Sequence, residues 1–261
     1  ISKASQDIMQ WGVKYEPVTI MIYEDLYKTK VGEFGCIRHS KYHYVGASPD
    51  GINILPSSEK YGTMLEIKNI VNREITGIPK EEYWIQTQIQ METCDLDKCD
   101  FVETRIKEYD NEEDFYKNST NTNYRGIVLH FINNDFSEND SPTYIYMPLD
   151  IPLNPESIDE WIIKEKEKVD NMILFNKLYW YLDEISCVLI QRNRAWFSKA
   201  IHHIKDVWDT IEKEKVEGYE HRSPKRRIPK MSVTIDDISG SHTITNIPST
   251  NKICLIKLDS K

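Results

Sequence analysis

The sequence predicts an α/β domain with a mixed central β-sheet flanked by helices on both faces. Three observations favour this class. Segments with helical spacing of apolar residues lie toward both ends of the chain, alternating strand-like runs lie between them, and one helical segment separates two of those runs. The resulting order is that of a layered α/β or α+β domain. With 261 residues, of which 39% are hydrophobic, the chain is long enough to bury a core.

The first third of the chain carries the clearest local signals. Residues 1–30 show mixed helical spacing, with Pro17 as a kink or as a break between two helices. "FGCIRHSKYHYVGA" predicts a β-hairpin over residues 34–47, and "TMLEIKNI" predicts a strand over residues 63–70. "PKEEYWIQTQIQMETC", residues 79–94, predicts a helix because a proline stands at its start and two glutamates lie in its first turn.

The remaining chain divides into strands, helices and a C-terminal extension. Three alternating runs predict strands: "CDFVETRIKEY", "RGIVLHFI" and "TYIYMPLDI". Residues 154–182 predict one long helix that opens with an Asn-Pro cap, and residues 193–218 predict another. We therefore predict a core with C-terminal helices over residues 1–217. Residues 218–261 would form a basic, proline-punctuated linker followed by the short β-like runs "SVTIDDI" and "KICLIKL".

The net charge and the cysteine content limit the classes of function and the compartments that fit this sequence. A formal net charge of −9 argues against a protein coated in basic surface, but permits a local basic groove or acidic residues gathered around divalent metals. Five scattered cysteines favour a reducing, intracellular compartment. Cys94 and Cys99 have no second Cys/His pair at a spacing typical of zinc sites. We see no signal peptide or membrane-spanning run, and Ile1 suggests a fragment or a processed chain.

Three charged residues lie at the edges of segments that otherwise look buried. Asp50 occupies a Pro-Asp-Gly turn, and Glu66 and Lys68 flank Ile67 in the strand "LEIK". Because side chains alternate along a strand, Glu66 and Lys68 share one face. One interpretation is an ion pair on a solvated strand edge. The other is a site in which two carboxylates bind Mg²⁺ or Mn²⁺ while the lysine acts on the attacking water.

The spacing of these residues is the signature of the PD-(D/E)XK nuclease superfamily. Three neighbouring blocks make the resemblance more specific: "SPDG" at residues 48–51, "YWIQTQ" at residues 83–88, and an upstream "WGVKYEP" at residues 11–17. Together with "LEIK", these blocks resemble the phage-lambda-type exonuclease branch, the YqaJ viral recombinase family. The resemblance covers roughly residues 11 to 90 and implies a restriction-endonuclease-like core.

The resemblance also implies a metal-dependent nuclease, with Mg²⁺ as cofactor and Mn²⁺ as a substitute, acting on the ends of double-stranded DNA in recombination or repair. It implies that Asp50, Glu66 and the Ile67 carbonyl bind the metal and that Lys68 acts on the attacking water. It also implies that Glu16 supports the metals and that Gln86 holds Lys68 or the water. Tyr83 and Gln88 would be supporting residues. Tyr83, Gln86 and Gln90 share one helix face by their spacing alone.

Partners and alternatives complete these expectations. Candidate nucleic-acid contacts are Ser48, Arg73, Arg226 and Arg227. A homo-oligomer, a single-strand annealing partner and an origin in a large DNA virus are implied by resemblance only. His39 could approach the metal or lie exposed in the hairpin. A structure-specific DNA or RNA endonuclease and a catalytically silent binding module are the alternatives, and the intact acid and lysine positions argue against the silent one.

Overall fold

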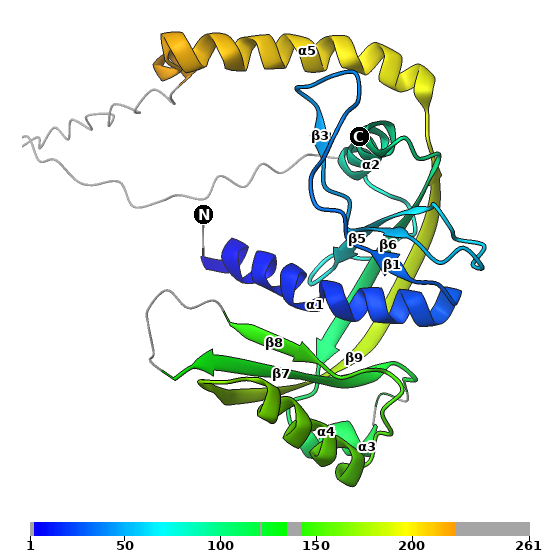
Figure 1. The fold of residues 1–261 in the computed structure, drawn as a ribbon, viewed down its shortest axis with the longest axis vertical. Coiled ribbons are helices and arrows are strands. Elements are labelled where there is room, and N and C mark those ends of the chain that lie inside the picture. Colours follow the sequence, from blue (N-terminus) through cyan, green and yellow to red (C-terminus); the bar gives the residue numbers. More distant parts are fainter. Residues whose placement is uncertain (1–2, 119, 121, 135–141, 223–261) are drawn as a thin grey trace, which may run out of the picture. The chain divides into compact units, whose positions relative to one another are not determined.

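A seven-stranded mixed sheet lies at the centre of the computed structural model, which describes residues 3–222 apart from 119, 121 and 135–141 (Figure 1). The elements are α1 (Lys3–Tyr27), β1 (Val31–Gly32), β2 (Ile37–Arg38), β3 (Gly46–Ala47), β4 (Gly51–Asn53), β5 (Met64–Asn69), α2 (Glu81–Cys94), β6 (Lys98–Glu108), α3 (Glu112–Lys117), β7 (Arg125–Asn133), β8 (Thr143–Tyr146), α4 (Pro155–Lys168), β9 (Met172–Gln191), α5 (Arg194–Glu217) and a short 3₁₀ turn, Glu220–Arg222. The fold class predicted from the sequence is confirmed.

The sheet mixes parallel and antiparallel strands in the order β1-β4-β5-β6-β9-β7-β8. Only β5 and β6 pair in parallel, with Glu66 opposite Phe101, and α2 forms the crossover between them. All other neighbours in this sheet are antiparallel. The predicted hairpin is present as β2 and β3, which form a separate two-stranded sheet.

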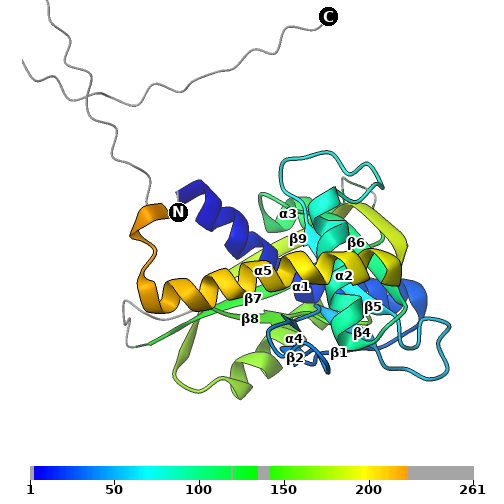
Figure 2. The ribbon, with the colours of Figure 1, turned by 90° about the horizontal axis from the view of Figure 1, so that it is seen from above.

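Helix α1 covers one face of the large sheet (Figures 1 and 2). Its residues Tyr15, Val18 and Ile22 are fully buried and pack against strands β6, β7 and β9. The helix runs without a break through Pro17, so the second of the two predicted alternatives, a division into two helices, is wrong. We attribute its continuity to this packed face, since tertiary burial outweighs one lost backbone hydrogen bond.

Helices α2 and α4 cover the opposite face. Met91 of α2 packs against Met64 and Phe101, whereas Trp161 of α4 packs against a second cluster that contains Phe131. Alternation of side chains along β5 and β6 sends one set toward α1 and the other toward α2. The site described below lies on the α2 side of β5.

The long helix predicted over residues 154–182 is wrong beyond Lys168. After a turn in which Asn171 has a φ of 60°, the chain forms the 20-residue strand β9 between β6 and β7. Its Tyr179 packs on the α4 side of the sheet and its Trp180 on the α1 side. Because the consecutive residues Tyr179 and Trp180 are both buried, one on each face, this run lacks the simple alternation of a half-buried strand and resembles a helix.

Contacts divide the chain into two units, residues 1–205 and 206–261, and the border lies inside α5. The division predicted between residues 217 and 218 stays a prediction. The two β-like runs predicted near the C-terminus lie outside the described residues. No helix in the described part of the chain has the length and apolar character needed to span a membrane.

Candidate active site

Asp50 is fixed at the entrance to β4. Its Oδ2 accepts a hydrogen bond of 2.6 Å from the backbone N–H of Ile67 in the neighbouring strand. Gly51 follows because a Cβ at that position would lie 2.2 Å from Cγ1 of Val31. The glycine therefore lets β1 approach β4 closely, and the Ser-Pro-Asp-Gly block acts as a junction that holds Asp50 against β5.

Glu66 is the centre of a buried polar cluster. Its side chain is only 1% exposed. Its Oε1 accepts hydrogen bonds from Lys68 Nζ and, at 2.7 Å, from Gln86 Nε2, while its Oε2 accepts one of 2.8 Å from Gln90 Nε2. The interpretation as an ion pair on a solvated strand edge is therefore wrong, because the carboxylate is buried and bonded from α2 as well as from its own strand.

The predicted alternation along β5 is confirmed. Ile67 packs against Tyr23 of α1, on the face opposite Glu66. Lys68 lies on the Glu66 side, with its Nζ 5.2 Å from the ring centroid of Tyr83. The structure thus brings together Asp50, Glu66, Lys68, Gln86 and Tyr83.

Glu16 reaches this cluster from α1. Asn69, at the end of β5, donates a hydrogen bond of 2.9 Å from Nδ2 to the backbone oxygen of Gly12 and so ties α1 to the strand. Burial raises the pKa of the Glu16 carboxyl, and the negative charge of Glu66 raises it further. The upstream acid therefore lies within electrostatic reach of the other carboxylates.

Asp50 shows the same crowding of negative charge more strongly. Burial raises its pKa to about 7, with Glu66 as the second cause, although the hydrogen bond from Ile67 N–H acts in the opposite direction. Buried carboxylates that repel one another are stabilised by a cation. Their hard oxygen atoms are ligands that Mg²⁺ prefers, and so the residues present fit a divalent ion.

Among the described residues, no three His, Cys, Asp or Glu side chains already converge as a metal-binding group. The oxygens of Glu66 are engaged by Lys68, Gln86 and Gln90 instead. Mg²⁺ commonly uses one or two carboxylates and completes its coordination with water and substrate oxygens. Two protein carboxylates are therefore a sufficient set.

The charge crowding predicts a pH-dependent stability of the metal-free protein. Asp50 holds its proton more tightly in the folded protein than in the unfolded chain, so the free energy of unfolding should fall as the pH rises from about 4 to about 7. We expect Asp50→Asn to raise the melting temperature at pH 8, by about 2–4 °C for each kcal/mol gained when a charge that is buried and repelled by Glu66 is removed. The gain should vanish near pH 4, and thermal melts in chelator at both pH values test this. An equal gain at both pH values would contradict the assignment.

One predicted residue, Gln88, and one residue outside the predicted set, Gln90, lie differently from expectation. Gln88 does not contact the cluster: its amide bonds the backbone oxygen of Gln191 and the backbone N–H of Asn193, and it therefore joins α2 to the end of β9. Its predicted role as a supporting residue is thus structural and indirect. Gln90 was not among the predicted site residues, although its spacing from Tyr83 and Gln86 was the signal that could have identified it.

The predicted nucleic-acid contacts are only partly described. The side chain of Arg73 lies beside Tyr83, with its Cζ 5.7 Å from the ring centroid, and pairs with Glu103. Ser48 is exposed, and its backbone oxygen accepts a hydrogen bond of 3.4 Å from Gln90. Arg226 and Arg227 lie outside the described residues.

His39 is a structural residue of the hairpin. It is 8% exposed, and its Nδ1 accepts hydrogen bonds from the backbone N–H groups of Lys41 and Tyr42. This side chain is therefore neither an exposed histidine nor a member of the carboxylate cluster.

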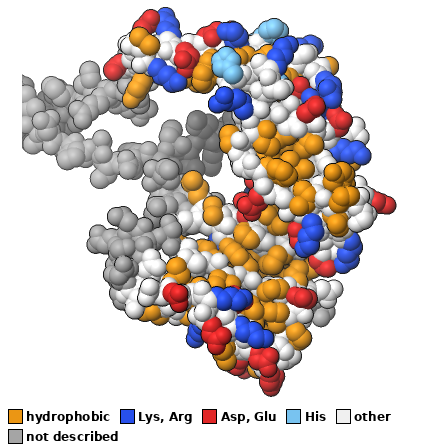
Figure 3. Space-filling view, viewed as in Figure 1, with side chains coloured by type: hydrophobic (Ala, Val, Ile, Leu, Met, Phe, Trp, Pro, Cys, Tyr) orange, Lys and Arg blue, Asp and Glu red, His pale blue; other side chains and the backbone are white. Residues whose placement is uncertain are grey.

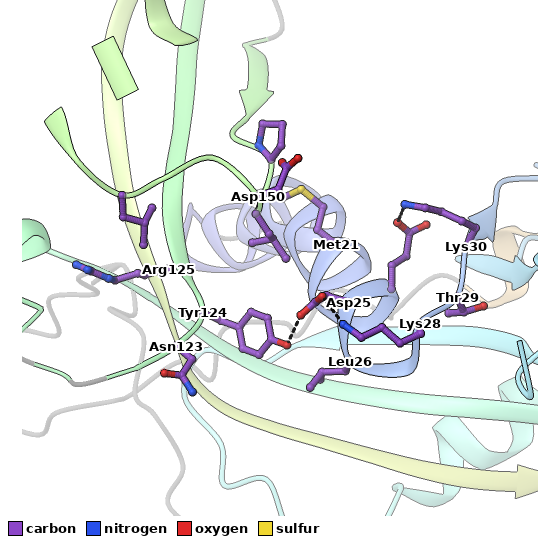
Figure 4. Close-up of a pocket in the computed structure, with 14 residues that line it drawn as sticks. Met21, Asp25, Leu26, Lys28, Thr29, Lys30, Asn123, Tyr124, Arg125 and Asp150 are labelled. Atoms are coloured by element: carbon purple, nitrogen blue, oxygen red, sulfur yellow. Dashed lines mark hydrogen bonds and ion pairs between the residues drawn. The ribbon is translucent and has the colours of Figure 1, made fainter. Parts of the chain in front are cut away.

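A cleft of about 840 Å³ lies elsewhere on this unit (Figure 4). Lys28 and Tyr124 both bond Asp25, and Lys30 pairs with Glu24, so these charges are satisfied within the cleft. None of its lining residues belongs to the carboxylate cluster. The cleft and the Glu66 cluster are therefore separate sites on this unit.

Comparison with known proteins agrees with the motif resemblance. Residues 2–97 match the model of the YqaJ-like viral recombinase domain. The uncharacterized protein R354 of Acanthamoeba polyphaga mimivirus is 30% identical over 234 residues, which cover 77% of this chain and 42% of that protein. The chain thus spans less than half the length of this curated relative.

Two solved structures are similar over part of the chain. They are an alkaline exonuclease, LHK-Exo, from Laribacter hongkongensis, with a TM-score of 0.34, and the same enzyme in complex with dAMP, with a TM-score of 0.33. Both are 24% identical to this chain and align with 64% of it. The alignment covers 65% of the first solved chain and 71% of the chain in the dAMP complex. The four motif blocks lie within residues 2–97, so the match of this segment to the YqaJ-like viral recombinase domain confirms the family resemblance.

Proposed function

We propose that this chain is a metal-dependent deoxyribonuclease that acts as an exonuclease on the ends of duplex DNA. The observation that carries the proposal is the buried Glu66 carboxylate, bonded by Lys68 and Gln86 and close enough to Asp50 to raise its pKa. A merely structural ion pair would not require two further acids nearby. Recombination or repair is the process that a viral recombinase domain suggests.

In this proposal Asp50, Glu66 and the Ile67 carbonyl hold Mg²⁺, and Glu16 supports the bound ion. When bound, Mg²⁺ stabilises charge on the phosphate and lowers the pKa of the attacking water. The Nζ of Lys68 orients that water, or accepts its proton when Lys68 is in the neutral amine form, and Gln86 holds the Glu66 carboxylate beside Lys68. The ring of Tyr83 braces the Lys68 side chain from α2.

DNA is held by a local group of cations and not by a broad basic surface. Lysine and arginine alternate with acidic side chains over the described residues visible in Figure 3. Around the ring of Tyr83, however, Arg73 and Lys80 lie at 5.7 and 5.9 Å from the centroid, on the same ring as Lys68. We propose that these two side chains bind backbone phosphates next to the scissile bond.

This contact predicts the salt dependence of DNA binding. Arg73→Met and Lys80→Met should each lower the slope of log affinity against log salt by about 0.9, since each removes one phosphate contact. Fluorescence anisotropy of a labelled duplex in Ca²⁺ measures the slope, because Ca²⁺ tolerates looser coordination and should permit binding with little cleavage. Lys107→Met is the matched control, since Lys107 and Lys80 are 48% and 50% exposed. An unchanged slope in both test variants would remove these cations from the DNA interface.

Incubation with matched circular and linear duplex DNA in Mg²⁺ tests the function itself. Loss of linear DNA alone supports an exonuclease. Cleavage of both indicates the endonuclease alternative, and cleavage of neither indicates a binding module. Full activity in excess chelator would exclude the metal mechanism.

We also propose a homo-oligomer, an annealing partner and an intracellular location. The four described cysteines are free thiols, which is compatible with a reducing compartment.

A further inference from the structure

Gln90 is the one described residue that bonds the second oxygen of Glu66. It is 4% exposed on α2, and its Nε2 donates to Glu66 Oε2 at 2.8 Å and to the backbone oxygen of Ser48 at 3.4 Å. The other oxygen of Glu66 is already shared by Lys68 and Gln86. One amide group therefore connects β5 to the turn that carries Asp50.

The orientation of the Gln90 amide is determined by Glu66. The NH₂ group of Gln90 faces Glu66 Oε2, and this carboxylate oxygen accepts its hydrogen bond. The Gln90 Oε1 is then left buried without a hydrogen-bond partner among the described residues, which carries a free-energy penalty.

Gln88, two residues away and 1% exposed, bears no such penalty. Its Nε2 donates to Gln191 O at 3.0 Å, and its Oε1 accepts from Asn193 N at 2.6 Å. The amide of Gln88 therefore joins α2 to the end of β9, whereas the amide of Gln90 is directed at the Glu66 carboxylate and the turn that carries Asp50.

We propose that Gln90 is a positioning residue that holds Glu66 and the Ser48–Asp50 turn in a single geometry competent to bind a divalent cation. The inference rests on the proposed function, because it assumes that Asp50 and Glu66 are metal ligands. Groups that orient a metal ligand change metal affinity when they are removed, even though they do not touch the ion.

The test measures Mn²⁺ affinity, by the electron paramagnetic resonance signal of free Mn²⁺, together with thermal melting of the full chain. Gln90→Met should weaken Mn²⁺ binding by about 10–100-fold. Its melting temperature should also fall, because Glu66 Oε2 is left buried without its partner. Gln88→Met is the matched control on the same helix: it removes the two hydrogen bonds of a buried amide, so it should lower the melting temperature as well but leave Mn²⁺ affinity unchanged.

The outcomes separate this inference from the proposed function. If Gln90→Met binds Mn²⁺ like the wild type while Glu66→Gln does not bind it, the positioning role is overturned and the metal site remains. If Gln88→Met weakens Mn²⁺ binding as much as Gln90→Met, the effect belongs to general packing of α2, and the inference is again overturned. A wild-type chain that binds no Mn²⁺ would overturn both proposals. Gln90→Asn, which retracts the amide by one methylene, gives the same readout should Gln90→Met not fold.

Discussion

Glu66→Gln is expected to reduce cleavage of linear duplex DNA by about 10³-fold or more, because one anionic ligand worth several kcal/mol in transition-state stabilisation is lost. The shape of the side chain is kept, and removing the charge relieves repulsion on Asp50 and Glu16. We therefore expect the folded state to survive the substitution. Single-turnover cleavage with saturating enzyme and Mg²⁺ measures the rate, and a thermal melt measures folding.

Asp100→Asn provides the matched control for Glu66→Gln. Asp100 is a fully buried carboxylate on the adjacent strand and pairs with Lys60 and Tyr23. Its loss should lower stability while leaving the cleavage rate of the folded protein intact. A wild-type rate for Glu66→Gln would end the nuclease assignment, whereas equal losses in both variants would indicate a general effect of buried charge.

Lys68→Met is expected to slow single-turnover cleavage by about 10²–10⁴-fold, the usual contribution of a positioned proton-transfer group. Methionine keeps most of the aliphatic stem beside Tyr83 but removes the group that bonds Glu66. DNA affinity should change little. Lys68→Arg should not restore the rate, since a guanidinium stays protonated and its planar fork does not fit the space of a compact amine.

Lys60→Met is a close match for Lys68→Met. The Lys60–Asp100 pair has side chains 25% and 1% exposed, and the Lys68–Glu66 pair has side chains 23% and 1% exposed. Both variants remove one lysine from a half-buried ion pair and leave a buried acid behind, so they share any penalty in stability. Only Lys68→Met should lose turnover. A normal rate for Lys68→Met would reduce Lys68 to a structural partner of Glu66.

Much of the site could be predicted from sequence because its elements have strong local signals. Period-2 alternation placed Glu66 and Lys68 on one face of β5, and the structure agrees. The four motif blocks predicted which residues would meet through their resemblance to the YqaJ viral recombinase family. The sequence alone therefore determined the fold class, the order of the site elements and most of the residues in the cluster.

Tertiary structure decided what local patterns leave open. Residues 172–191 became a strand because β6 and β7 each require a hydrogen-bonding neighbour, a long-range demand that apolar spacing does not encode. The choice between Gln88 and Gln90 depended on how α2 is rotated on the sheet, which is determined by packing of Met91 against Met64 and Phe101. Two residues along a helix differ by about 200° in direction, so that rotation sent Gln90, on the face of Gln86, to Glu66 and Gln88 to the end of β9.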